Sequence, residues 1–122
     1  MSGGTSRSAE LHAVTKKRLD YAARARRDIE AIETYYLEEA GESVADRAVD
    51  AILTQAEKIA ALDLKFRPGI RAGTRECVMT RFPYTLVYLS RAREVRIVRV
   101  LHQRSEYFNR MTAPKRAIIR RP

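Results

Sequence analysis

The sequence of 122 residues contains a single cysteine, Cys77, and no long run of apolar residues. One cysteine excludes an internal disulfide and cannot build a metal site alone. A segment that crosses a bilayer needs roughly 20 consecutive apolar residues, and the N-terminal stretch lacks the apolar core of a secretory signal. We therefore expect a cytoplasmic protein that binds no metal, no cofactor and no membrane.

Acidic residues are scarce relative to basic ones. The chain has 15 Asp and Glu residues against 24 Lys and Arg residues, which gives a net charge of +9. A field of this sign attracts polyanions, which include nucleic acid, a ribosome or an acidic protein segment. The apolar share of 45% and the charged share of 32% are typical of one folded domain.

Two amphipathic helices are predicted between residues 22 and 62. The apolar residues of the first recur at steps of three and four residues: Ala22, Ala25, Ile29, Ile32 and Tyr36. Gly41 ends this helix, because glycine accepts the left-handed conformation that helix ends often need. Ser43 is predicted to begin the second helix, with Asp46 completing a capping pair. Its apolar stripe consists of Ala45, Val49, Ile52, Ala56 and Ile59, and it closes at Leu62. A turn this short predicts that the helices lie antiparallel.

Strands are predicted before and after the two helices in the sequence. Residues 16–22 suit a short first strand, and the turn signals Arg67-Pro68-Gly69 and Ala72-Gly73 precede three apolar runs. These runs are Thr74–Phe82, Tyr84–Ser90 and Glu94–His102. Short connections predict an antiparallel meander, and the mostly apolar character of both faces of the last run places it centrally. The order indicates an α+β fold with a helical hairpin packed on one face of a small sheet.

The chain resembles the RelE/ParE superfamily of toxins through the order and spacing of several short motifs. The motifs are Arg67-Pro68-Gly69, Gly73-Thr74-Arg75-Glu76, Arg81-Phe82-Pro83-Tyr84, Val87-Tyr88 and Val95–His102 followed by Gln103-Arg104. The stretch from Asp28 to Tyr36 is similar to the first helix of ParE-like members. The resemblance implies a β-α-α-β-β-β fold, mainly antiparallel in its sheet, over residues 16–107. Residues 1–15 are rich in Gly, Ser and Thr and are expected to form a flexible leader, and residues 108–122 are expected to form a basic tail.

The resemblance also implies a cognate antitoxin, often acidic, and one of two activities. RelE-like members cut messenger RNA on the ribosome, whereas ParE-like members poison DNA gyrase by binding it. RNA cleavage needs cationic groups to stabilise the crowded phosphate. The positions that match the nuclease lysines and arginine hold Glu76, Val78 and Thr85. We therefore favour the ParE-like branch, which acts without chemistry of its own.

Several residues remain candidates for a site. If the chain is a nuclease, the catalytic candidates are His102, Arg104 and Tyr107, although His102 equally suits a buried, hydrogen-bonded role in the final turn. The candidates for binding a target are Arg75, Arg81, Arg99 and Arg104. The alternative for these arginines is ion pairing with Asp or Glu within the chain. Cys77 is expected to be a small buried apolar residue.

A third class is a helix-turn-helix DNA-binding protein, because two helices flank a glycine in a basic chain. Helices of nearly 20 residues with stripes suited to a sheet argue against it. The sequence thus predicts a ParE-like toxin that inhibits DNA gyrase, with a ribosome-dependent endoribonuclease as the alternative.

Overall fold

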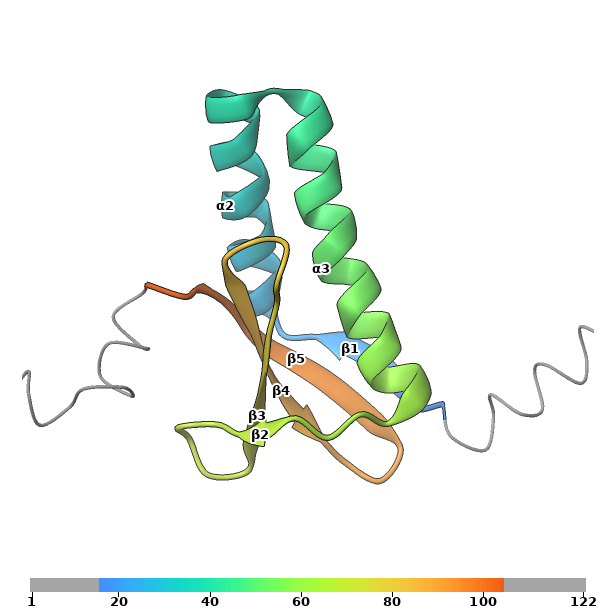
Figure 1. Cartoon of the computed structure of the whole chain (residues 1–122). Helices are drawn as coiled ribbons and strands as arrows, with labels where there is room; N and C mark the ends of the chain where they lie inside the picture. The colour runs from blue at the N-terminus through green and yellow to red at the C-terminus, as the bar shows by residue number, and fades with distance from the viewer. Residues whose placement is uncertain (1–15, 105–122) are drawn as a thin grey trace, which may run out of the picture.

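The computed structural model of the chain describes residues 16–104, in which two helices pack on one face of a five-stranded sheet (Figure 1). In chain order the elements are β1 (Arg18–Tyr21), α2 (Ala23–Ala40), α3 (Glu42–Leu62), β2 (Arg67–Pro68), β3 (Thr74–Val78), β4 (Tyr84–Ser90) and β5 (Glu94–His102). The predicted α+β architecture is confirmed, and β2 is an additional strand of two residues. The predicted leader 1–15, Tyr107 and the predicted tail 108–122 lie outside the described residues.

The strands lie in the order β1-β5-β4-β3-β2. β1 pairs in parallel with β5, and the other neighbours are antiparallel. The predicted bounds of the last two strands are confirmed, and β5 is an inner strand of the sheet, as predicted, with β1 on one side and β4 on the other. The register between β4 and β5 shifts at Val87/Tyr88, so one residue of β5 bulges there.

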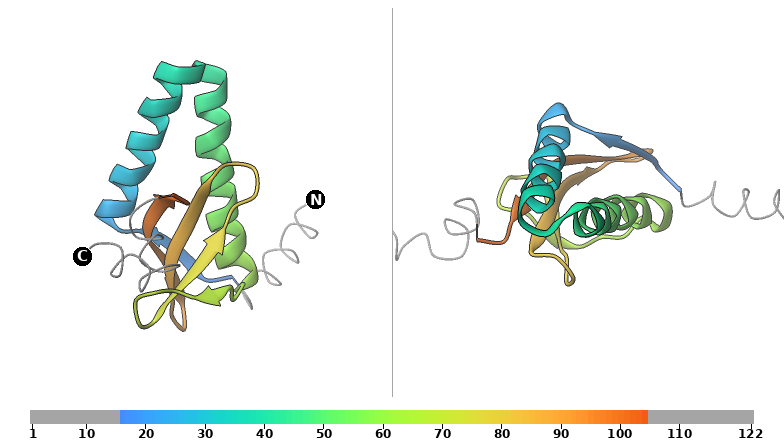
Figure 2. Two further views of the ribbon diagram at one scale, coloured as in Figure 1. Left: turned by 60° about the vertical axis from the view of Figure 1, so that its left-hand side comes forward. Right: turned by 90° about the horizontal axis from the view of Figure 1, so that it is seen from above.

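The core lies between the helical hairpin and the sheet. Its largest fully buried apolar side chains are Tyr88, Ile52, Ile59, Leu86, Ile97 and Val95. Gly41, with a φ of 95°, ends α2 and precedes α3. The turn at Gly41 extends past the strands, so the distal part of the hairpin stands clear of the sheet (Figure 2). Neither helix of the described chain has the length and apolarity needed to cross a membrane.

One predicted strand boundary is wrong. The strand that begins at Thr74 ends at Val78 rather than Phe82. The amide of Met79 still donates to the Tyr84 carbonyl at 2.9 Å, and the amide of Tyr84 donates to the Phe82 carbonyl at 2.8 Å. The chain therefore already turns at these residues, where Pro83 lacks an amide for a ladder.

The predicted capping pair of the second helix is also wrong. α3 begins at Glu42, and its N-cap is Gly41, which has no side chain to cap with. The Ser43 hydroxyl instead accepts a hydrogen bond from Arg47 at 3.1 Å. At the other end, Leu62 is 57% exposed although it was assigned to the apolar stripe, because α3 ends there and the chain turns away at Asp63.

Candidate functional site

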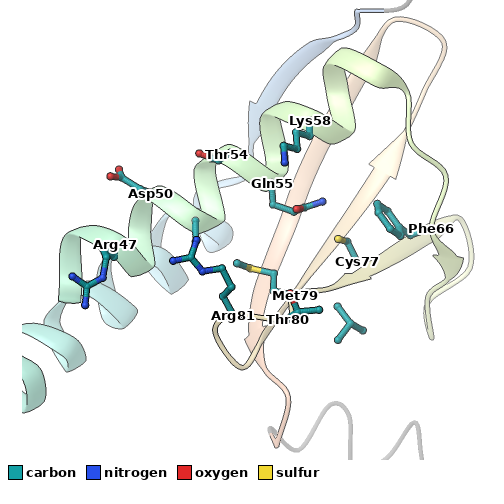
Figure 3. Close-up of a pocket in the computed structure, with 12 residues that line it drawn as sticks. Arg47, Asp50, Thr54, Gln55, Lys58, Phe66, Cys77, Met79, Thr80 and Arg81 are labelled. Carbon is teal, nitrogen blue, oxygen red and sulfur yellow. The ribbon is translucent and has the colours of Figure 1, made fainter. Parts of the chain in front are cut away.

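A groove of about 530 Å³ runs between α3 and the end of β3 (Figure 3). We call it the α3–β3 groove. Its wall on the helix consists of Arg47, Asp50, Ala51, Thr54, Gln55 and Lys58. These positions recur at steps of three and one, which places them on one face of a helix. The opposite wall consists of Phe66 and the segment from Cys77 to Arg81.

The floor of the groove is apolar. Cys77 is 2% exposed and Met79 is 9% exposed, and Gln55 points from α3 toward Cys77 (Figure 3). Burial raises the pKa of the Cys77 thiol, while a hydrogen bond with Gln55 acts in the opposite direction. A thiol with a raised pKa stays protonated near neutral pH and is a poor nucleophile. The predicted role of Cys77 as a small buried residue therefore agrees with its surroundings.

The edge of the sheet is open along this groove. β2 pairs only with Arg75 and Glu76 of β3. Within residues 16–104, no strand therefore pairs with the outer edge of β3 at Val78. The side chain of Val78 is 44% exposed. An unpaired strand edge offers backbone donors and acceptors to another extended chain. The groove thus combines an apolar floor with a short stretch of free backbone.

The rim of the groove carries three cations, Arg47, Lys58 and Arg81, against one carboxylate, Asp50. All four are exposed, and Arg81 extends toward α3 (Figure 3). The excess of positive charge favours an anionic partner, and the apolar floor favours one that also carries apolar side chains.

The four arginines proposed to bind a target lie in different environments. Arg81 lines the groove, and Arg104 is exposed just after β5. Arg75 donates to the Phe66 carbonyl at 2.8 Å, next to the connection that follows α3. The structure therefore does not bring the four together in one patch.

Arg99 forms the closest connection between sheet and hairpin among these arginines. Its Nε donates to Asp28 Oδ2 at 2.8 Å and its second nitrogen donates to Oδ1 at 3.2 Å. Asp28 Oδ2 also accepts from the amide of Val100 at 2.9 Å. β1 ends at Tyr21, opposite Ile97, so it cannot pair with Val100 of β5. The Asp28 carboxylate instead accepts the hydrogen bond of the Val100 amide. This is the ion-pairing alternative for Arg99, and no pattern in the sequence identifies Asp28 as its partner.

The positions that match the nuclease cations lie together on β3 and β4. Val78 is the direct register partner of Thr85, and Glu76 lies two residues before Val78, which places it on the same face. Glu76 and Thr85 are each 1% exposed. The Glu76 carboxylate accepts from Arg67 at 3.2 Å and from the amide of Ile70 at 3.3 Å. Glu76 thus holds the loop that follows β2, and these three side chains offer no cation to a phosphate.

His102 lies at the end of β5 and is exposed. The alternative that it is buried in the final turn is therefore wrong in that respect. His102 does take part in the final turn, since its Nδ1 accepts from the amide of Arg104 at 2.9 Å. Its ring contacts Tyr84 edge-on, with 5.4 Å between centroids. Burial and a hydrogen bond with Tyr36 raise the pKa of Tyr84, so this phenol stays protonated and does not supply a base.

The described residues, 16–104, contain no cluster of three or more His, Cys, Asp or Glu side chains that suits a metal ion. Sequence reasoning missed the helix wall of the groove. In the sequence this wall corresponds to the row of polar residues on α3 from Arg47 to Lys58. Without the position of β3, such a row indicates only a solvent-exposed helix face.

Comparisons with known proteins agree with this fold. The family model of the ParE toxin of the type II toxin–antitoxin system parDE matches residues 19–107. The protein Y4kP of Sinorhizobium fredii, provisionally named a toxin, is 31% identical over 94 residues, which cover 77% of this chain and 96% of Y4kP. A chain from the structure of a chromosomal ParDE system of P. aeruginosa matches with a TM-score of 0.65 at 24% identity, covering 72% of this chain and 97% of that one. The chain belongs to the ParE toxin family, within the RelE/ParE superfamily.

Proposed function

We propose that this ParE-family chain inhibits growth by binding DNA gyrase and is neutralised by a cognate antitoxin. The observation that carries the choice of gyrase over messenger RNA is the chemistry of three positions on β3 and β4. Glu76 is a buried carboxylate, Thr85 is a buried hydroxyl and Val78 is apolar. Loss of one preorganised charge stabiliser typically lowers a rate by about 100- to 1000-fold, and here none of the three positions supplies one. Inhibition by binding needs no such group.

The late end of β5 is the observation that favours the alternative, a ribosome-dependent endoribonuclease. His102 and Arg104 are both exposed there, and one ring nitrogen of His102 already accepts a hydrogen bond from the amide of Arg104. An imidazole alone can move a proton, but it cannot stabilise a pentacovalent phosphate without nearby cations. We therefore keep this activity as the second candidate.

The α3–β3 groove suits the antitoxin. An extended segment that pairs with the free backbone at Val78 adds a strand to the sheet, and its alternate side chains reach the floor at Cys77 and Met79. Acidic side chains of the same segment lie near Arg47 and Arg81 on the rim. The P. aeruginosa match is a ParDE toxin–antitoxin system, which supports a protein partner of this kind for the present chain.

Expression of the chain without its antitoxin tests the proposal. We expect growth arrest with induction of the DNA-damage response, inhibition of supercoiling by purified gyrase, and intact messenger RNA. Co-expression of the neighbouring reading frame should restore growth, which serves as the control for specific toxicity. Codon-specific cuts in ribosome-bound messages, with gyrase unaffected, would overturn the gyrase assignment and make His102 and Arg104 the catalytic candidates.

A further inference from the structure

The end of the sheet opposite the β3–β4 loop gathers basic side chains from two distant parts of the sequence. The start of β1 and the turn between β4 and β5 lie side by side there (Figure 1), and the amide of Arg18 donates to the Arg93 carbonyl at 2.9 Å. Four exposed cations result: Lys16, Arg18, Arg91 and Arg93. We call this set the basic end.

Carboxylates near the basic end are few and are already engaged. Arg96 binds Asp20 at 2.9 Å and lies 3.8 Å from Glu94. Arg18 approaches Glu94 only to 3.9 Å, and its side chain is 78% exposed. Within the part of the chain that the structure describes, Arg91 and Arg93 make no ion pair. The basic end therefore keeps most of its positive charge.

The composition of the turn points to a phosphate ligand rather than to an apolar protein surface. Residues 91–94 read Arg-Ala-Arg-Glu, so Ala92 is the one uncharged side chain in the turn. Contacts from Arg and Lys to backbone phosphates need neither a pocket nor a particular base sequence. The basic end and the α3–β3 groove lie at opposite ends of β4. The groove is lined by Cys77 to Arg81, which lead into the β3–β4 loop, whereas the basic end includes the turn that follows β4. A ligand of the basic end thus leaves the groove free.

We propose that the basic end binds the phosphate backbone of duplex DNA, so that the toxin contacts the DNA that its target enzyme holds. The choice of duplex DNA rests on the proposed gyrase target. The expected contact is independent of sequence and sensitive to salt, since each neutralised phosphate releases condensed counterions. It adds to the attraction between toxin and the gyrase–DNA complex without requiring a change in the fold.

The test is binding of the full chain to a fluorescent 20-base-pair duplex of random sequence, measured by anisotropy at several salt concentrations. The variant R91A/R93A removes two charges from the basic end. Its matched control, R24A/R27A, removes two exposed arginines from α2, away from this end of the sheet. We expect the slope of log affinity against log salt to fall by about 1.8 in the first variant, because each lost phosphate contact lowers it by about 0.9. The control should keep the wild-type slope, and R91K/R93K, which retains the charges, should restore it.

Equal slopes for R91A/R93A and the control overturn the proposal, as does tighter binding to single-stranded RNA or to anionic lipid vesicles under the same conditions. Inhibition of gyrase by the wild-type chain is measured separately. If that inhibition holds while the two double variants bind DNA alike, the gyrase assignment survives and the basic end is discarded. If the slope changes as expected while gyrase is unaffected, the DNA contact stands and the proposed function fails.

Discussion

The helical hairpin and the later half of the chain differ in charge. Residues 23–62 carry five basic and nine acidic side chains, whereas residues 63–104 carry ten basic and three acidic ones. The two regions thus have net charges of −4 and +7. They pack against each other across the core, so the overall charge of +9 conceals a molecule with an acidic layer and a basic layer.

This difference changes what the net charge indicates about partners. We expect an acidic antitoxin to be attracted to the sheet side of the α3–β3 groove, where Arg81 lies, more than to the distal hairpin with Glu38, Glu39 and Glu42. Polyanions are likewise repelled from that acidic tip. Partner binding is therefore expected to depend mainly on cations of the later half, to which the hairpin adds only Arg47 and Lys58 on the rim of the groove.

The two layers are joined by the ion pair of Asp28 and Arg99, and its removal is expected to have the largest effect. In Asp28→Ala, Arg99 loses two hydrogen bonds and the Val100 amide loses its acceptor. Hydrogen bonds to charged groups contribute about 1.5 to 3 kcal/mol, so the free energy of unfolding should fall by about that amount in urea denaturation. Asp28→Asn keeps an acceptor oxygen and should lose less.

Glu30→Ala is the matched control for this prediction. Glu30 is exposed on the same helix, and its replacement should change the free energy of unfolding by less than about 0.5 kcal/mol. Equal effects of the Asp28 and Glu30 variants would show that the layers do not depend on this ion pair.

The α3–β3 groove lies between the two layers, and filling it is expected to have an intermediate effect, on antitoxin binding. Thr54 is exposed on the helix wall, so Thr54→Trp places a large ring in the groove without disturbing the core. We expect binding of the purified cognate antitoxin to weaken about tenfold, which corresponds to about 1.4 kcal/mol. Calorimetric titration measures the change.

Glu57→Trp provides the comparison, because Glu57 is exposed one turn further along α3 and does not line the groove. It should bind the antitoxin as the wild type does. Unchanged affinity for both variants would place the antitoxin on another surface of the toxin.

Elements of this fold were predictable where one local pattern determines them. The bounds of β4 and β5 follow from apolar runs separated by polar turn residues, and the end of α2 follows from Gly41. The end of β3 was not predictable in the same way. Apolar residues continue to Phe82, and only the hydrogen bonds of Met79 and Tyr84 show that the chain has already turned.

The groove and the basic end were not predictable because each joins residues far apart in the sequence. Arg47 and Arg81 meet only after α3 is packed along β3, and Arg18 meets Arg93 only through the parallel pairing of β1 with β5. The open edge at Val78 depends on β2 being two residues long, a length that the turn signal at Arg67-Pro68-Gly69 does not reveal. Glu76 can be seen from the sequence alone to be unsuited to a nuclease, but its role in holding the loop at Ile70 is visible only in the structure.

Arg104 belongs to the basic layer alone, and its replacement is expected to have the smallest effect on stability. Its backbone amide, not its side chain, donates to His102, and its side chain is exposed. Arg104→Ala should therefore change the free energy of unfolding by less than about 0.5 kcal/mol, leaving the melting temperature near that of the wild type. If target binding depends on the basic layer, growth arrest should nevertheless weaken.

Arg24→Ala removes an equal charge from an exposed position on the hairpin and should leave growth arrest intact. Equal loss of toxicity in both variants would mean that total charge, rather than its distribution between the two layers, determines how the toxin meets its target.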